Sequence, residues 1–264
     1  MPNSSQVFLS FEHLLTTKPH DIRAVFVSDL HLSEQTTSLT AAFNHLLMNL
    51  IKLPNLQHLF ILGDFLDAWL GDDDFINQTW LKQTTDLLQA LSDHCHIYIM
   101  HGNRDFTLGQ QFCDIFRGTL IQAPYYHAIK GKIIRLEHGD ALCTDDISYQ
   151  RYRAIIQNPV VKFCLLNTPL VVRQKLAKTI KSQAHKDKNK KPKVVMDVND
   201  AAVQLALKTC DILIHGHTHR PAVHNHHDKT RVVLGDWHYN DNQVTAVIGV
   251  ACETVALYTF KHQT

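Results

Sequence analysis

Seven side chains with the chemistry of metal ligands recur in short polar motifs along the chain. All seven offer oxygen or nitrogen, and none is a cysteine. Carboxylate, amide and imidazole groups favour Mn, Fe, Zn or Mg over a structural zinc site made of thiolates. The seven residues are Asp29 and His31 in SDLH, Asp64 in GD, Asn103 in GNRD, His138 in EHGD, and His217 and His219 in GHTH.

The size of this set predicts two metal ions rather than one. A catalytic ion keeps coordination positions open for water, so seven protein ligands exceed what one such ion holds. We therefore expect two ions that share one carboxylate. Asp29 and His31 are two residues apart, as are His217 and His219, so in extended backbone each pair points to one side.

Taken singly, each of these residues also has an ordinary structural explanation. A lone His31 or His138 could be a buried histidine with satisfied hydrogen bonds. Asp29 alone could cap a helix, and Asn103 alone could form a turn. The ordered set, with every member at the end of a strand-like run, is far more specific than any single motif.

Some polar neighbours of the motifs are predicted to lie outside the ligand set. The acids at 72–74 are interpreted as capping or solvated residues. His101 and His215 alternate with the ligand positions, so we interpret them as packing or supporting residues.

The elements that must position the seven ligands are short, buried strands. Five runs of β-branched, aromatic or aliphatic residues end in the polar motifs, as expected of strands buried on both faces. Stretches with helical spacing around 39–50 and 81–91 separate the first three runs, which predicts βαβαβ with parallel strands. Ligands bind beyond the carboxyl ends of such strands, so the five ends are expected to meet in one site. The runs are 24–29, 58–64, 96–103, 132–140 and 211–219.

The segment from about 145 to 193 departs from this alternation. It contains twelve Lys or Arg residues and, after Asp146, a single acid; it also contains the apolar run 160–172. We interpret it as a largely helical insertion, ending in a Lys-rich loop, within a single domain spanning residues 1–264. After GHTH, the runs RVVLGDW, QVTAVIGVA and TVALYTF predict a closing β meander.

Composition excludes several classes of protein. The chain is 45% hydrophobic, which is enough for a core, and its net charge of +1 argues against a globally basic nucleic-acid-binding protein. Six cysteines without a C-x-x-C pair predict free thiols in a reducing compartment. Residues 1–20 lack the pattern of an export signal, and no apolar run is long enough to cross a membrane.

The ordered motifs resemble the calcineurin-like metallophosphoesterase superfamily, whose pattern is D-x-H, G-D, G-N-H-[DE], H and G-H-x-H. One position departs, because Arg104 stands where most members have a histidine that protonates the leaving group. From about Ala24 to Trp237 the chain is similar to the family of hydrolases that cleave UDP-2,3-diacylglucosamine in lipid A biosynthesis. The matching motifs are SDLHL, ILGDFLDAWLGDDD, GNRDF, HGDALCTDD, MDVN and IHGHTHRPAVH.

The resemblance implies a fold, two Mn ions and a reaction. The fold is α/β, a layered β-sandwich flanked by helices with the insertion as a lid. Water activated between the ions would attack the α phosphorus and release UMP and 2,3-diacylglucosamine 1-phosphate, while Arg104 would contact the diphosphate. The implied ligands are Asp29, His31, Asp64 and His219 for one ion, and Asp64, Asn103, His138 and His217 for the other, with Asp64 as the bridge.

The resemblance also implies substrate contacts and a location. At the end of the insertion the family has a Ser-x3-Asn-x2-Lys set, which here is Ala184, Lys188 and Lys191, so only the lysine is retained. The apolar run would receive acyl chains, and the basic residues would meet the anionic, cytoplasmic face of the bacterial inner membrane. No obligate protein partner and no nucleic acid is expected. The implied substrate contacts are Asn103, Arg104, Asp146, Tyr149, Lys188, Lys191 and His217.

Two other functions remain open at this point. A generalist dimetal phosphodiesterase or phosphatase of the same fold would need neither Arg104 nor a basic, apolar insertion. An inactive scaffold would be expected to lose ligands, whereas all seven are present.

Overall fold

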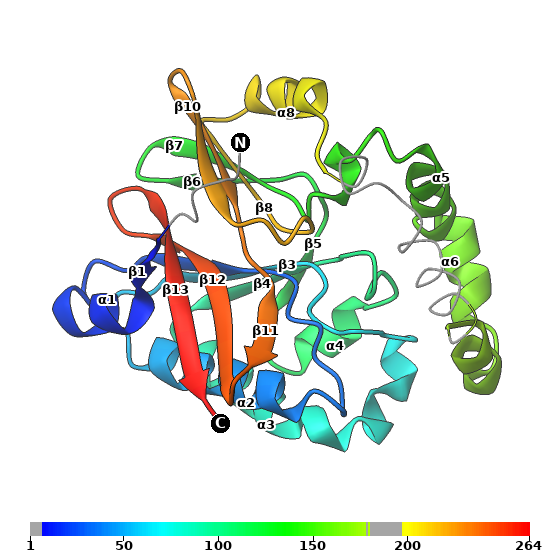
Figure 1. Ribbon diagram of the computed structural model, residues 1–264. Helices are drawn as coiled ribbons and strands as arrows, with labels where there is room; N and C mark the ends of the chain where they lie inside the picture. Colours follow the sequence, from blue (N-terminus) through cyan, green and yellow to red (C-terminus); the bar gives the residue numbers. More distant parts are fainter. Residues whose placement is uncertain (1–6, 178, 180–196) are drawn as a thin grey trace.

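Two β-sheets lie against one another, with helices on the outer side of each (Figure 1). The computed structural model describes residues 7–177, 179 and 197–264. The layered α/β sandwich predicted from the sequence is confirmed. The larger sheet has the order β1 (Leu9–Ser10), β13 (Val255–Gln263), β12 (Gln243–Ala251), β2 (Ala24–Val27), β3 (His58–Leu62), β4 (His96–Met100) and β5 (Thr119–Ile121), and β11 (Trp237–Asn240) pairs with β12. The smaller sheet has the order β6 (Tyr125–Ile129), β7 (Lys132–Leu136), β8 (Ile212–His215), β10 (Lys229–Val233) and β9 (Ala222–His226).

Successive side chains of the central strands point to opposite faces of the larger sheet and form a hydrophobic layer on each face. In β3, Leu59 and Ile61 pack on the helix side of the sheet, whereas Phe60 and Leu62 pack between the two sheets. Phe60 stacks on Phe26 of β2 with ring centroids 5.1 Å apart. Because successive side chains of a strand point to opposite faces, a strand covered on both sides reads as a continuous apolar run.

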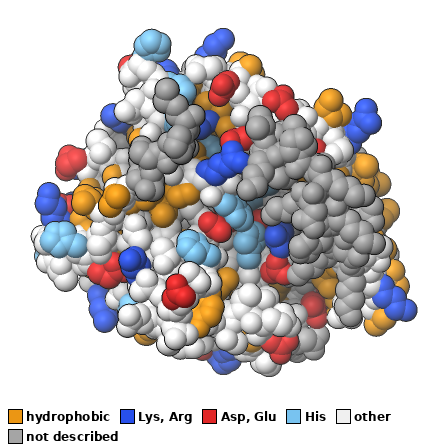
Figure 2. Space-filling view, viewed as in Figure 1, with side chains coloured by type: hydrophobic (Ala, Val, Ile, Leu, Met, Phe, Trp, Pro, Cys, Tyr) orange, Lys and Arg blue, Asp and Glu red, His pale blue; other side chains and the backbone are white. Residues whose placement is uncertain are grey.

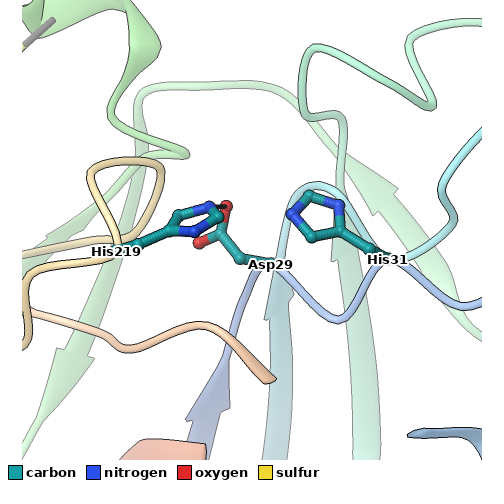
Figure 3. Close-up of side chains that lie close together, drawn as sticks. All are labelled: Asp29, His31 and His219. Atoms are coloured by element: carbon teal, nitrogen blue, oxygen red, sulfur yellow. Dashed lines mark ion pairs between the residues drawn. The ribbon is translucent and has the colours of Figure 1, made fainter. Parts of the chain in front are cut away.

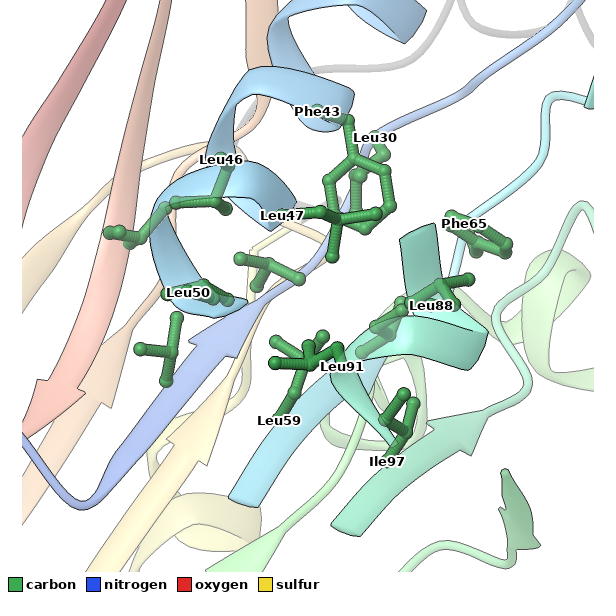
Figure 4. Close-up of a cluster of buried hydrophobic side chains, with 14 of the residues drawn as sticks. Leu30, Phe43, Leu46, Leu47, Leu50, Leu59, Phe65, Leu88, Leu91 and Ile97 are labelled. Carbon is green, nitrogen blue, oxygen red and sulfur yellow. The ribbon is translucent and has the colours of Figure 1, made fainter. Parts of the chain in front are cut away.

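Helices cover both outer faces. On the larger sheet, α2 (Thr37–Ile51) and α3 (Lys82–Leu91) bury leucines such as Leu47 and Leu88 against β3 and β4, as the helical spacing predicts (Figure 4). On the smaller sheet, α8 (Asp200–Leu207) packs Val203 with Leu213 of β8. The shorter helical elements outside the insertion are α1 (Phe11–Thr17), η1 (Asp72–Asn77), η2 (Thr79–Leu81), α4 (Gln110–Asp114) and η3 (Asp140–Leu142).

Strand pairing confirms part of the predicted topology and corrects another part. Strands β2, β3 and β4 are parallel neighbours, as predicted, and β5 extends the parallel set. The predicted pairing of QVTAVIGVA with TVALYTF is confirmed by β12 and β13, and β11, which was not predicted, pairs with β12. The run RVVLGDW was wrongly included in the predicted meander, because β10 pairs with β8 and β9 in the smaller sheet. The chain crosses between the sheets after β10, at Leu234–Asp236.

The insertion is helical in its described part and leaves much apolar surface open. It contains α5 (Ile147–Ile156), α6 (Pro159–Leu166) and a helical stretch at 170–177. No residue of α6 is buried, and hydrophobic side chains are visible along the edge of the molecule where α5 and α6 lie (Figure 2). None of the helices described is both long and apolar enough to cross a membrane. The predicted Lys-rich loop lies outside the described residues.

In the described part of the insertion, two ion pairs connect it to the sandwich. Arg153 of α5 contacts the buried Asp140 at 2.7 Å. Arg173, itself buried, pairs with Asp73 in the acidic run 72–74. The solvated interpretation of that run is therefore wrong for Asp74, which is buried, while the capping interpretation is right for Asp72, which accepts hydrogen bonds at the start of α4.

All six cysteines are free, as predicted. Four are buried, Cys252 is half-buried and Cys164 of α6 is exposed. Burial raises the pKa of Cys95, Cys113 and Cys143 to about 12, so these thiols stay protonated at neutral pH.

Candidate metal centre

The loops that follow the strands hold most of the predicted ligands in an uncommon backbone conformation. Positive φ is rare for residues other than glycine and costs on the order of 1–3 kcal/mol, so its repetition here indicates a functional constraint. Hydrogen bonds between the loops stabilise it: the Asp29 N–H donates to Gly63 O at 3.1 Å, and the His31 N–H to Asp64 O at 2.9 Å. The residues are Asp29 (φ 54°), His31 (φ 51°), Asp64 (φ 51°), His217 (φ 68°) and His219 (φ 55°).

Two glycines allow these loops to approach the carboxylates closely. A Cβ on Gly102 would lie 2.1 Å from Asp64 Oδ1, and a Cβ on Gly216 would lie 2.3 Å from Asp29 Oδ2. Any other residue at either position would displace a carboxylate. The glycines in GNRD and GHTH are therefore required by the crowding of the site.

The first group of candidate ligands is Asp29, His31 and His219. Their ligand atoms all lie within 4.8 Å of one another, and the two imidazoles lie on either side of the Asp29 carboxylate (Figure 3). His219 Nε2 is 3.3 Å from Asp29 Oδ1. The Asp29 carboxylate also accepts hydrogen bonds from the Ser28 hydroxyl (2.7 Å) and the His217 N–H (2.8 Å), which fix its orientation.

The second group is Asp29, Asp64 and His138, again with ligand atoms within 4.8 Å. His138 Nδ1 lies 2.9 Å from Leu62 O, so this nitrogen donates to the carbonyl and Nε2 faces the site. Asn103 Oδ1 and His217 Nδ1 each lie 3.2 Å from His138 Nε2. The structure therefore brings these three side chains together around one point.

Asp64 belongs to the second group and also approaches a histidine of the first. Its Oδ2 is 3.7 Å from His31 Nδ1, and its Oδ1 is 3.8 Å from His138 Nε2. It is almost fully buried and accepts a hydrogen bond from the Arg104 backbone N–H at 2.9 Å. All seven predicted ligands thus lie in one continuous cluster. Histidine side chains gather near the centre of the face shown in Figure 2.

The cluster holds more buried negative charge than it can neutralise without protons or a cation. Burial, together with Asp105 and Asp29, raises the pKa of Asp64 to about 7. Burial alone would lower the pKa of His138, but Asp64, Asp29 and Asp140 raise it to about 9. For Asp29, burial is outweighed by contacts with His219 and His138, so its pKa falls below the usual range. A divalent cation would take the place of the protons on the histidines.

Two other imidazoles are ready to bind metal without losing a proton. Burial, with a further contribution from Arg104, lowers the pKa of His31 to about 4. Burial and the neighbouring His138 lower the pKa of His217 to about 4. Both rings are therefore neutral at pH 7 and keep a lone pair for a ligand bond.

Buried polar atoms that lack a hydrogen-bond partner provide a separate indication that the site can bind a metal ion. Both ring nitrogens of His31 are buried without a hydrogen-bond partner. Buried polar groups left without a partner cost about 1–3 kcal/mol each, so native structures rarely keep them. Because these atoms lie in a set of oxygen and nitrogen donors, the residues fit a divalent metal ion.

Arg104 lies at the rim of the cluster. Its Nε is 3.7 Å from Asp64 Oδ2, its guanidinium pairs with Asp67, and 35% of its side chain is exposed. Asp67, which was not predicted from the sequence motifs, thus orients the guanidinium group of Arg104. The arrangement leaves a charged, planar group beside the buried acids and open to a ligand.

Asp105 and Asp236 also organise the cluster and were not predicted. The Asp105 carboxylate accepts hydrogen bonds from the N–H groups of Gly102 and Phe65, both at 2.8 Å, and so joins the loops after β4 and β3. Asp236 lies 3.3 Å from His219 Nδ1. A signal for Asp236 existed, because RVVLGD repeats the pattern of an apolar run ending in GD that marks Asp64.

The residues predicted to contact substrate differ in how closely they approach the centre. The Tyr149 hydroxyl donates to Asp140 at 3.0 Å, and its ring lies 5.8 Å from that of His217. Asp146 caps α5 by accepting from the Tyr149 N–H at 3.0 Å. Lys188, Lys191 and the neighbouring Ala184 lie outside the described residues.

His101 and His215 are supporting residues, as predicted. His101 Nε2 bonds to the Leu108 carbonyl, and His215 is fully buried with Nδ1 2.9 Å from the Gly216 carbonyl. Neither belongs to the two ligand groups.

Comparison with known proteins gives consistent matches. A sequence model of the family described as calcineurin-like phosphoesterase matches residues 22–221. A protein from Haemophilus influenzae named UDP-2,3-diacylglucosamine hydrolase is 39% identical over 218 residues, which cover 81% of this chain and 90% of that protein. A Coxiella burnetii protein of the same name is 40% identical over 222 residues, covering 81% of this chain and 89% of its own. A solved archaeal phosphodiesterase aligns with a TM-score of 0.46 and 13% identity, covering 89% of this chain and 98% of that one.

Metal affinity is expected to rise with pH. Without metal, the pKa values of about 9 for His138 and about 10 for His219 mean that both rings hold protons at pH 7, which a cation must displace. Between about pH 6 and 8, the apparent affinity for Mn²⁺ should rise about tenfold per pH unit for each proton released. Titration calorimetry in buffers of different ionisation enthalpy measures that release. Affinity independent of pH, with no proton release, would contradict the electrostatic description.

Proposed function

The chain belongs to the calcineurin-like phosphoesterase family, and we propose that it hydrolyses the diphosphate of UDP-2,3-diacylglucosamine with two Mn ions. The products are UMP and 2,3-diacylglucosamine 1-phosphate, the latter an intermediate of lipid A biosynthesis. The observation that carries the proposal is the cluster around Asp64 with Arg104 at its rim, in a chain whose relatives are named for this substrate. The match also agrees with the resemblance predicted from the motifs.

The ligand assignment is the one that the resemblance implies, with Asp64 rather than Asp29 as the shared carboxylate. Asp64 would be the ligand shared by the two ions, which is supported by its contacts with both His31 and His138. The chemistry that two divalent ions supply when bound is activation of water for in-line attack at the α phosphorus and neutralisation of the charge that develops. One ion would be held by Asp29, His31, Asp64 and His219, and the other by Asp64, Asn103, His138 and His217.

Arg104 binds the diphosphate. Its guanidinium carries five N–H donors in a planar fork, suited to two phosphate oxygens at once, and it stays charged at every relevant pH. Asp67 holds that fork in place, so less conformational freedom is lost when substrate binds. In this role Arg104 stabilises charge on the phosphates and transfers no proton.

The remaining substrate contacts come from around the centre and from the insertion. The proposed contact between Tyr149 and the substrate is supported by the proximity of Tyr149 to His217. The proposed contact of Asp146 is supported by its position at the start of α5. Lys188 and Lys191 are proposed from the resemblance alone, since they lie outside the described residues. Asn103, Arg104 and His217 complete the set.

The insertion receives the acyl chains and contacts the membrane. Val160 and Phe163 of α6 and Val171 beyond it are 69%, 68% and 61% exposed, an unusual density of apolar surface for three residues so close in sequence. Basic residues of the same segment supply attraction to anionic lipid. We infer that the whole chain is one domain, with residues of about 145–193 as its lid, that acts at the cytoplasmic face of the bacterial inner membrane without nucleic acid or an obligate protein partner.

A direct assay tests the proposed reaction. Purified protein in Mn²⁺ should release UMP from UDP-2,3-diacylglucosamine dispersed in detergent. Absence of UMP while simple nucleotide phosphodiesters turn over would contradict the substrate assignment and favour a generalist phosphodiesterase. Absence of all turnover with no Mn²⁺ bound would favour the inactive scaffold.

Replacing Asp64 should remove metal and activity together. In Asp64→Ala the carboxylate proposed as the ligand shared by both ions is lost, so neither ion would keep its full set of ligands. We expect turnover to fall by more than about 10³-fold and bound Mn²⁺, measured by elemental analysis, to fall below one ion per chain. Asp86→Ala, on the exposed face of α3, is the matched control. Substantial residual turnover would mean that the two-metal assignment is wrong.

Replacing Arg104 should reduce activity without reducing metal binding. For Arg104→Ala we expect kcat/KM to fall about 10²–10³-fold while both Mn²⁺ ions remain, because the side chain contacts the diphosphate and no metal. Arg104→Lys, which keeps the charge and loses the fork, should recover only part of the loss. Loss of Mn²⁺ from Arg104→Ala would count against a role facing the substrate.

Polar substitutions on α6 should weaken membrane binding and leave the metal centre intact. Val160→Ser with Phe163→Ser removes two exposed apolar side chains from a helix without buried residues. Flotation with vesicles containing anionic lipid should therefore recover several-fold less of the variant, with bound Mn²⁺ unchanged. Ile133→Ser, an exposed apolar position on β7, provides the control. Equal flotation of the α6 variant and wild type would show that α6 does not contribute to membrane binding.

A further inference from the structure

Asp236 lies behind His219, on the side of the imidazole away from Asp29. Its Oδ2 is 3.3 Å from His219 Nδ1, and Nε2 of the same ring is 3.3 Å from Asp29 Oδ1. Each ring nitrogen therefore faces a carboxylate, and the orientation of the ring is set from both sides.

The segment that carries Asp236 is itself held by both sheets. It follows β10 of the smaller sheet and leads into β11 of the larger one. On one side, the Gly235 N–H donates to Val247 O of β12 at 2.8 Å. On the other, the Trp237 N–H donates to Asp29 O at 3.3 Å. The backbone on either side of Asp236 is thus fixed relative to the metal centre.

His219 differs in this respect from the other candidate imidazole ligands. His138 turns its Nδ1 to a backbone carbonyl, His217 turns its Nδ1 to His138, and the ring nitrogens of His31 have no hydrogen-bond partner. Among these four rings, and within the described part of the chain, only that of His219 is paired with a carboxylate from outside the seven proposed ligands.

We propose that Asp236 is a positioning residue for the metal centre, accepting the Nδ1–H of His219 so that the Nε2 lone pair faces the cation. A carboxylate behind a histidine ligand fixes the tautomer and makes the ligating nitrogen a stronger donor. The inference rests on the metal-binding part of the proposed function and extends it, because Asp236 touches neither the metal nor the substrate.

The competing explanation is that Asp236 serves only the turn between β10 and β11. In that case its removal would loosen the loop whether or not His219 is present. A positioning role makes a different prediction, since an effect transmitted through the ring disappears when the ring is removed. The two explanations therefore separate in a double-mutant cycle.

The experiment measures Mn²⁺ affinity, by competition with a fluorescent chelator, for wild type, Asp236→Ala, His219→Ala and the double variant. We expect Asp236→Ala to bind the more weakly held Mn²⁺ about 10- to 100-fold less tightly than wild type. In the His219→Ala background, the same substitution should change affinity by less than about twofold. Asp228→Ala, an exposed acid in the β9–β10 hairpin, is the control and should bind like wild type.

A conservative variant and a spectrum complete the test. Asp236→Asn keeps the size of the side chain and an oxygen acceptor but loses the charge, so its affinity should be about 3- to 10-fold weaker than wild type. Substitution with Co²⁺ should give a visible absorption spectrum that changes in Asp236→Ala and largely recovers in Asp236→Asn. If Asp236→Ala does not fold, the Asn variant decides the matter.

Two results would overturn the inference. One is a Mn²⁺ affinity within about twofold of wild type for Asp236→Ala or, if that variant does not fold, for Asp236→Asn. The other is an equal loss of affinity in the presence and absence of His219. Because no substrate is present, these outcomes are independent of whether UDP-2,3-diacylglucosamine is cleaved.

Discussion

Two buried carboxylates, Asp29 and Asp64, lie where the carboxyl ends of β2 and β3 face the second sheet, and the surrounding structure is arranged around their charge. Buried charge is unfavourable unless it is paired, and the raised pKa of Asp64 reflects that cost. The left-handed loops and the close glycine contacts all act to bring oxygen and nitrogen donors toward these two groups. A divalent cation supplies the charge that the protein chain does not.

The candidate ligands come from both sheets, so they lie together only when the sandwich is assembled. Asp29, Asp64 and Asn103 follow strands of the larger sheet, whereas His138 and the two histidines of GHTH follow strands of the smaller one. The apolar layer between the sheets therefore holds the ligand groups in register. Metal binding and sandwich stability are accordingly coupled, because a cation bound by both sheets favours the packed state over the unfolded one.

The insertion contacts the sandwich beside the candidate metal centre. Arg153 of α5 pairs with Asp140, two residues after His138, and Tyr149 bonds to the same carboxylate. A helix with an open apolar surface is thus connected to the metal centre by one buried acid. Substrate that contacts α5 and α6 would meet a lid whose position relative to the ions is already set.

Much of the fold and most of the site could be predicted because the relevant signals are local. A buried parallel strand has a continuous apolar sequence, and the polar residue that ends it is a candidate ligand, which is how Asp29 and His138 were predicted. Sheet membership was harder, since β10 resembles the strands after it and only long-range pairing puts it beside β8. Asp105 was missed because its role consists of hydrogen bonds to distant backbone. Asp74 was misjudged because its burial depends on tertiary packing that a run of acids does not reveal.

The number and spacing of the bound ions test the central claim most directly. Electron paramagnetic resonance of the Mn²⁺-loaded protein, combined with elemental analysis, reports both. Two ions per chain bridged by Asp64 should lie about 3.5–4 Å apart and give the spectrum of an exchange-coupled pair. A single ion, or two ions with the spectrum of isolated Mn²⁺, would contradict a dinuclear centre built on that carboxylate.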